Sequence, residues 1–110
     1  MKHAESKIQA EIFQYLRLHF PIVFMVGNDA PGNSTPQRVA RLKAMGLLPG
    51  VSDLVAVDNN GKILFIEIKT ETGRLSKRQK EFQQKCLDLD LPYVIIRSIE
   101  DAINFVGFWK

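Results

Sequence analysis

Cysteine is almost absent from this chain, since Cys86 is the only one among its 110 residues. A single thiol excludes an internal disulfide framework and is typical of proteins from a reducing cytosol. Histidine is also scarce: His3 and His19 stand far apart and isolated in the sequence. Such a pattern does not favour a zinc site, which draws on several closely spaced cysteine and histidine ligands.

Long apolar runs are missing as well. No stretch reaches the roughly 18 apolar residues that a transmembrane helix needs, so we expect no membrane span. Residues 1–5 (MKHAE) lack the apolar centre of a secretory signal. We therefore expect a cytoplasmic protein.

The composition is that of one small globular domain. Hydrophobic residues make up 45% of the chain and charged residues 25%, which are ordinary values. A chain of 110 residues can bury a single modest core, so we expect one domain over residues 1–110. The net charge of +3 permits a polyanionic partner such as nucleic acid but does not require one.

Hydrophobic periodicity predicts alternating helices and strands. Asn60-Gly61 lies between two apolar runs and predicts a tight hairpin, and the segment 28–35 is predicted to be a loop. The predicted fold is an α/β fold whose mixed β-sheet is flanked by helices on both faces, with a parallel crossover between the last two strands. We predict helices over residues 4–19, 36–45, 76–89 and 98–106, and strands over 22–26, 53–57, 62–69 and 93–96.

Charged residues at the ends of two predicted strands give the strongest functional signal. Asp53 begins one strand of the hairpin, and Glu67 and Lys69 end the other. Side chains alternate along a strand, so Glu67 and Lys69 point to one face, and the hairpin can bring Asp53 beside them. A carboxylate among apolar neighbours costs free energy unless it is paired or binds a metal. A structural ion pair between Glu67 and Lys69 is therefore the simpler alternative.

Two carboxylates at this edge suit Mg²⁺ or Mn²⁺, which take a few protein oxygens together with water and phosphate. Asp53 and Glu67 are the predicted ligands, and the Ile68 carbonyl is a plausible third. Lys69 could position or deprotonate a water, or neutralise charge on a phosphoryl group. This combination favours metal-dependent hydrolysis of a phosphodiester.

Two further residues are candidates for the same site. Glu5 falls on the inward face of the first predicted helix, whereas Glu11 is displaced from it by roughly a quarter turn. Glu5 could equally serve to complement the helix N-terminus. Gln79 follows Ser76 by three positions, which is the spacing of a capping box. A capping role would explain Gln79 by itself, and a role in the site is the alternative.

Basic residues flank these positions on both sides in sequence. Each alone would be a solvated surface charge, but together they suit a phosphate backbone. The predicted DNA-binding residues are Arg38, Arg41 and Lys43 before the site, and Arg74, Lys77 and Arg78 after it.

Four stretches of the chain form a recognisable series: ESKIQ at residues 5–9, GLLPGVSDL at 46–54, EIK at 67–69 and GRLSKRQ at 73–79. In these stretches and their order, the chain resembles the VRR-NUC domain of the PD-(D/E)XK nuclease superfamily. One departure is that the family often has proline before the first site aspartate, where this chain has Ser52. The chain is most similar to the short stand-alone form found in phages and bacteria.

The resemblance implies a restriction-endonuclease-like fold and a Mg²⁺- or Mn²⁺-dependent DNA endonuclease in a bacterial or phage-infected cell. It implies Asp53, Glu67 and Lys69 as the catalytic core, with Glu5 as the helix acid and Gln79 as the following polar residue. It also implies a homodimer that acts on duplex, nicked or branched DNA, in the manner of a Holliday-junction resolvase. Products with a 3′-OH and a 5′-phosphate would follow.

Two other classes of function stay open at this point. A non-catalytic DNA-binding module would keep the basic surface and bind DNA in a salt-sensitive way without cleaving it. An interaction protein would use the same charges as structural ion pairs, and Asp53→Ala would then alter its stability only.

Overall fold

The computed structural model describes residues 3–26 and 35–110, which form four helices and four strands. Their order along the chain is the predicted one. The elements are α1 (His3–Leu16), β1 (Ile22–Met25), α2 (Pro36–Ala44), β2 (Leu54–Val57), β3 (Ile63–Ile68), α3 (Lys77–Asp88), β4 (Tyr93–Ile96) and α4 (Ile99–Trp109).

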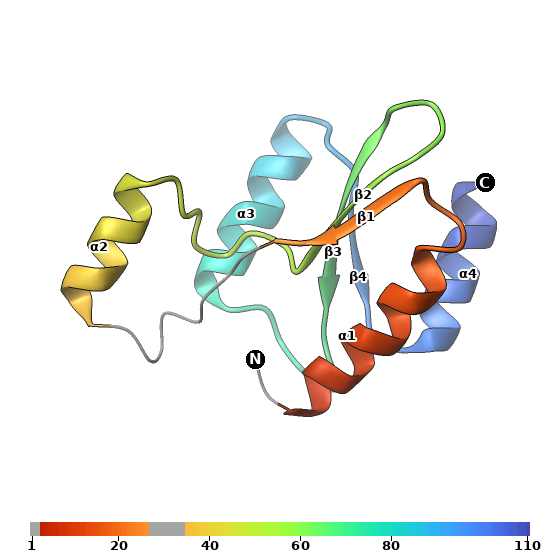
Figure 1. Cartoon of the computed structure of the whole chain (residues 1–110), viewed down its shortest axis with the longest axis horizontal. Coiled ribbons are helices and arrows are strands. Elements are labelled where there is room, and N and C mark those ends of the chain that lie inside the picture. The colour runs from red at the N-terminus through yellow and green to blue at the C-terminus, as the bar shows by residue number, and fades with distance from the viewer. Residues whose placement is uncertain (1–2, 27–34) are drawn as a thin grey trace.

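The strands form one mixed sheet in the order β1-β2-β3-β4. β1 pairs with β2 and β2 with β3 in antiparallel fashion, whereas β3 and β4 are parallel. The antiparallel pair β2–β3 is the predicted hairpin, and α3 makes the predicted crossover from β3 to β4 (Figure 1). The edges of the sheet are therefore β1 and β4.

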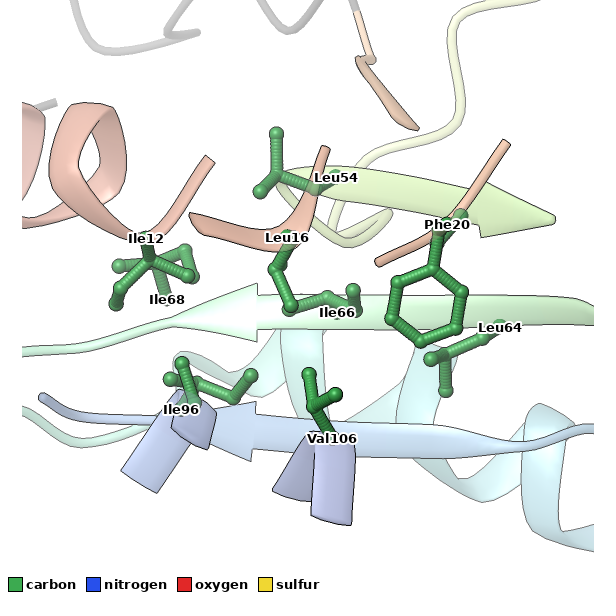
Figure 2. Close-up of a cluster of buried hydrophobic side chains, with 11 residues drawn as sticks. Ile12, Leu16, Phe20, Leu54, Leu64, Ile66, Ile68, Ile96 and Val106 are labelled. Carbon is green, nitrogen blue, oxygen red and sulfur yellow. The ribbon is translucent and has the colours of Figure 1, made fainter. Parts of the chain in front are cut away.

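One face of the sheet packs against α1 and α4. Leu64, Ile66 and Ile68 alternate along β3 and point to this face, where Ile12 and Leu16 of α1 meet them (Figure 2). The same cluster includes Leu54 and Ala56 from β2, Ile96 from β4, and Ala102 and Val106 from α4. Apolar burial on this face supplies the main driving force for folding.

The opposite face is covered by α3. Phe82 and Cys86 of α3 form a second, smaller cluster with Val51, against which Phe65 of β3 packs. Helices therefore cover both faces, and the predicted α/β fold class is confirmed. Because residues 65, 67 and 69 share a face, Glu67 and Lys69 belong to the α3 side of the sheet.

Two glycines allow the turns that position the hairpin. Gly61 adopts a positive φ of 79° beside Asp58, whose Oδ1 accepts hydrogen bonds from the backbone of Asn60 and Lys62. Gly50 has a φ of 82°, and a Cβ there would collide with the Arg78 carbonyl. The close approach at Gly50 brings the segment before β2 against the first turn of α3.

Some boundaries differ from the prediction. The first helix ends at Leu16 rather than at residue 19, because the chain turns there and buries Phe20 in the core. The last helix continues beyond residue 106 to Trp109, whose Nε1 donates to Asp58 Oδ2 at 3.2 Å. The predicted loop at 28–35 lies outside the described residues except for its last position.

Helix α2 has an unusual place in the fold. Thr35 caps its start and Pro36 occupies its first turn, as expected for a helix N-terminus. None of its side chains is buried, and Figure 1 shows it standing apart from the sheet. No helix among the described residues is long and apolar enough to cross a bilayer.

Candidate active site

Asp53 and Glu67 meet at one end of the β2–β3 hairpin. Asp53 directly precedes β2, and its Oδ2 accepts a hydrogen bond of 2.8 Å from the backbone N–H of Ile68. In the β2–β3 register Leu54 pairs with Ile66, so the next pair along the hairpin is Asp53 with Glu67. The hairpin geometry thus brings together two acids that are 14 residues apart in sequence.

Glu67 is the most deeply buried charged residue of the described chain, with 1% of its surface exposed. Its Oε2 lies 3.8 Å from Lys69 Nζ and accepts a hydrogen bond of 3.1 Å from Gln79 Nε2. Its Oε1 is also buried and has no hydrogen-bond partner among the described residues. One oxygen of this carboxyl group is therefore held by Lys69 and Gln79, and the other has no hydrogen-bond donor among the described residues.

The surroundings disfavour a negative charge on Glu67 when no cation is present. Burial, followed by the nearby charge of Asp53, raises the pKa of Glu67 to about 9. The ammonium group of Lys69 partly opposes this effect. A bound cation would supply the missing positive charge, because opposite charges favour the ionised carboxylate.

Gln79 completes the capping box that its spacing from Ser76 indicated, and its side chain also contacts Glu67. Its Oε1 accepts from the backbone N–H of Ser76 at 2.8 Å, and its own N–H donates to the Ser76 hydroxyl, which completes a capping box. Its Nε2 is directed at Glu67. The cap therefore fixes the orientation of the amide that positions the buried acid.

Glu5 lies in the first turns of α1 and is partly exposed. Its negative charge contributes to the raised pKa of Glu67, which places it within electrostatic range of the site. The five predicted residues Glu5, Asp53, Glu67, Lys69 and Gln79 thus lie in one region, around the end of β3.

The predicted DNA-binding residues are all exposed. Arg38, Arg41 and Lys43 lie on α2, Arg74 lies between β3 and α3, and Lys77 and Arg78 begin α3. Arg78 and Lys85 of α3 also line a shallow hollow with Leu48 and Pro49. Lys77 and Arg78 directly precede Gln79 on α3, whereas the three cations of α2 lie on a helix that stands apart from the sheet (Figure 1).

Arg97 also contacts this region, although no pattern in the sequence predicted it. This residue follows β4, and its Nη1 donates to the Thr70 and Gly73 carbonyls at 2.7 and 2.6 Å. Backbone carbonyls have no sequence signature, so these partners were invisible. The available signal was a lone basic residue at the carboxyl end of the strand expected beside the Lys69 strand.

Comparison with known proteins identifies the family. The model of the VRR-NUC domain matches residues 4–100. The chain belongs to the VRR-NUC domain family. A solved structure described as a VRR_NUC domain protein is 17% identical, with a TM-score of 0.75 over 99% of this chain and 89% of that one. Another, described as a VRR_NUC domain, is 15% identical, with a TM-score of 0.69 over 96% of this chain and 97% of that one. No curated protein matches the chain.

The VRR-NUC assignment agrees with the architecture. At this low identity the two solved structures show a shared fold, a mixed sheet flanked by helices. The family itself is a nuclease-type, DNA-processing domain. Ser52, where the family often has proline, is fully buried, and its hydroxyl donates to the Leu54 carbonyl at 3.0 Å. This serine therefore has a structural partner just before β2.

The donor set of this VRR-NUC site fits a small hard cation. The described residues contain no cluster of three or more His, Cys, Asp or Glu side chains arranged as a metal site. Mg²⁺ needs fewer protein ligands, because it keeps several waters and often binds through one or two carboxylates and substrate phosphate. Asp53 and the unpartnered Oε1 of Glu67 meet that requirement.

Proposed function

We propose that the protein is a metal-dependent DNA endonuclease that hydrolyses phosphodiester bonds. The observation that carries this proposal is the buried Glu67, with Lys69 and Gln79 on one carboxyl oxygen and no partner on the other. A purely structural ion pair would explain Lys69, but it would leave Oε1 of Glu67 without a donor and the negative charge of Asp53 close to a buried acid.

Asp53 and Glu67 would hold a Mg²⁺ or Mn²⁺ ion, with the Ile68 carbonyl as the proposed third protein ligand. When bound, such an ion lowers the pKa of water and neutralises charge on the phosphoryl oxygens. The Ile68 N–H holds Asp53 by its Oδ2. The supporting framework therefore lies in the backbone of β3 itself, which makes the position of Asp53 rigid.

The remaining site residues would orient the Glu67 carboxylate and balance charge around it. Gln79 holds Oε2 of Glu67, so that this carboxylate keeps one orientation. Among the described residues, Lys69 is the one lysine whose ammonium group pairs with Glu67. This group could stabilise charge that develops on the phosphoryl group, or it could hold the attacking water. Glu5 adds a negative charge that would strengthen attraction for a divalent ion.

We propose branched or structured DNA as the substrate and a homodimer as the active species. The products would carry a 3′-OH and a 5′-phosphate. The exposed cations of α2 and α3 support contact with a phosphate backbone. A domain of 110 residues offers little surface beyond the site, so a second copy would let the enzyme span two strands.

A cleavage assay tests this proposal. Purified protein is incubated with supercoiled plasmid and with a synthetic four-way junction, in Mg²⁺, in Mn²⁺ and in chelator. We expect cleavage with metal only, and a loss of at least about 100-fold in Glu67→Gln and Lys69→Met. Glu11→Gln is the matched control, because Glu11 lies exposed on α1.

Two results would contradict the proposal. Cleavage that persists in chelator, or in both site variants, would show that the acids and lysine do not form the active site. Salt-sensitive DNA binding without cleavage by the wild type would instead favour a non-catalytic DNA-binding module.

A further inference from the structure

The guanidinium group of Arg97 is bound to the loop that follows Glu67 and Lys69. Its Nη1 donates to the carbonyls of Thr70 and Gly73 at 2.7 and 2.6 Å, and it lies 3.4 Å from the carbonyl of Glu71. All three acceptors belong to the β3–α3 loop, defined here as residues 70–76, which follows Lys69. Among the described residues, the hydrogen bonds of this side chain go to backbone carbonyls.

The β3–α3 loop lies directly against the stem of Lys69. The Gly73 N–H donates to the Thr70 carbonyl at 3.1 Å, which closes a tight turn. A Cβ on Gly73 would stand 3.5 Å from Cδ of Lys69, so the turn passes close to the aliphatic part of the lysine. Lys69 is buried in spite of its charge, with 8% of its surface exposed. The turn therefore forms part of the wall that keeps its ammonium group beside Glu67.

The same loop determines where α3 begins. It leads to Ser76, the N-cap residue whose capping box orients Gln79. A change in the path of the loop would therefore move both groups that hold Oε2 of Glu67. Arg97 lies at the end of β4, the strand parallel to β3, and thus anchors the loop to the sheet from the neighbouring strand.

We propose that Arg97 is a positioning residue of this site: by binding the turn at residues 70–73, it holds the Lys69 ammonium and the Gln79 amide on Glu67. The inference rests on the proposed function, since it assigns Arg97 to the nuclease reaction. Arg97 acts through the loop and makes no contact with the reacting groups.

Arginine suits this task better than lysine does. A guanidinium group presents several N–H donors in a rigid plane and stays charged at any working pH. One ammonium group at the end of a flexible stem has no such fixed geometry. Arg97→Lys keeps the charge and should preserve part of the effect, whereas Arg97→Met removes both charge and donors.

Steady-state cleavage kinetics separate positioning from DNA binding. In Arg97→Met we expect kcat to fall by about 10- to 100-fold, as displacement of catalytic groups by about 1 Å would cause. The Kd for DNA in chelator should stay within about twofold of the wild type. The kcat of Arg97→Lys should lie between that of the wild type and that of Arg97→Met. Arg74→Met is the control, because Arg74 is exposed in the same loop and should affect Kd rather than kcat.

Amide hydrogen exchange supplies the second readout. Exchange at residues 70–75 should become faster in Arg97→Met, while exchange in β2 and β3 stays as in the wild type. Unchanged kcat, or a rise in Kd that accounts for the whole loss of kcat/KM, would overturn the proposal. If Arg97→Met does not fold, the same comparison is made with Arg97→Gln, which removes the charge and the guanidinium plane, and unchanged kcat and exchange in that variant would be equally decisive.

The failure of this inference is distinguishable from failure of the proposed function. A wild type that cleaves no DNA in any metal would refute the nuclease proposal, and with it the catalytic part of this one. The exchange comparison would still decide whether Arg97 orders the β3–α3 loop.

Discussion

At the scale of single residues, the properties of the site depend on the partners that compensate the burial of one acid, Glu67. Glu67 lies in a strand whose neighbours Ile66 and Ile68 are fully buried, where water cannot solvate its charge. Lys69 and Gln79 compensate this cost on one oxygen only. The rest of this desolvation cost lowers the stability of the folded chain when no cation is bound, and costs of this kind are common at functional sites.

This desolvation cost predicts a pH dependence of stability. The folded chain holds a proton on Glu67 up to about pH 9, whereas the unfolded chain releases it near pH 4.5. Stability in chelator should therefore be greatest below that window and fall as the pH rises through it, by at most about 1.4 kcal/mol per pH unit. Urea unfolding followed by Trp109 fluorescence between pH 5 and pH 9 measures the slope.

Glu67→Gln removes the titrating group, so its unfolding free energy should change less with pH than that of the wild type. At pH 8 this variant should also be more stable than the wild type. Glu11→Gln, an exposed change, should retain the wild-type slope. Added Mg²⁺ should stabilise the wild type more than Glu67→Gln, because a ligand of the folded state stabilises it by mass action. Identical slopes for Glu67→Gln and the wild type would contradict the raised pKa.

The two roles of Gln79 can be separated by one substitution. Glutamate is the other residue that completes a capping box, so Gln79→Glu should keep the stability of α3 within about 0.5 kcal/mol. It replaces the N–H donor to Glu67 with a negative charge, and cleavage should fall by at least about 10-fold. Thermal unfolding measures the expected stability, and plasmid cleavage measures the expected loss of activity.

Ser76→Ala is the complementary variant, since it removes the cap and should cost about 1 kcal/mol of stability. If Gln79→Glu cleaved DNA as the wild type does, the contact between Gln79 and Glu67 would have no catalytic significance.

At the scale of elements, local signals predicted much of the fold. Asn60-Gly61 between apolar runs predicted the hairpin, and the hairpin alone brings Asp53 to Glu67. Features that depend on distant contacts were not predictable in the same way. The first helix ends where Phe20 must enter the core, and Arg97 finds its partners across 24 to 27 residues of sequence.

Helix α2 is the element whose stability owes least to the core. A helix of nine residues is marginal in water, and none of its side chains is buried. Its exposed cations would gain partners on a phosphate backbone. We predict that the double variant Arg41→Gln and Lys43→Gln weakens DNA binding and lowers the slope of log K against log salt by about 2.

Fluorescence anisotropy over a range of salt concentrations measures this slope. Because neither side chain is buried, the unfolding midpoint should stay unchanged. Arg17→Gln, just beyond the end of α1, removes one exposed cation outside α2 and should leave the slope unchanged. An unaltered slope in the α2 variant would exclude this helix from the DNA interface.

At the scale of the whole molecule, one edge strand of the sheet carries apolar side chains that no other described residue buries. β1 is an edge strand, and three of its four side chains, Ile22, Phe24 and Met25, are exposed. An exposed apolar edge is a template for pairing with another chain. Two copies of β1 could pair antiparallel across a two-fold axis, which is the commonest symmetry of soluble homo-oligomers.

We predict that the proposed homodimer forms through β1. Phe24→Lys should shift the mass measured by light scattering from dimer toward monomer, because a buried charge at the centre of such a pair is costly. Phe108→Lys is the matched control: Phe108 is 87% exposed on α4, away from that edge. In Phe24→Lys, cleavage of the four-way junction should fall more than cleavage of linear duplex, because cutting a junction requires two active sites in one particle. A monomeric wild type at micromolar concentration, or a dimer disrupted by Phe108→Lys alone, would rule out the β1 interface.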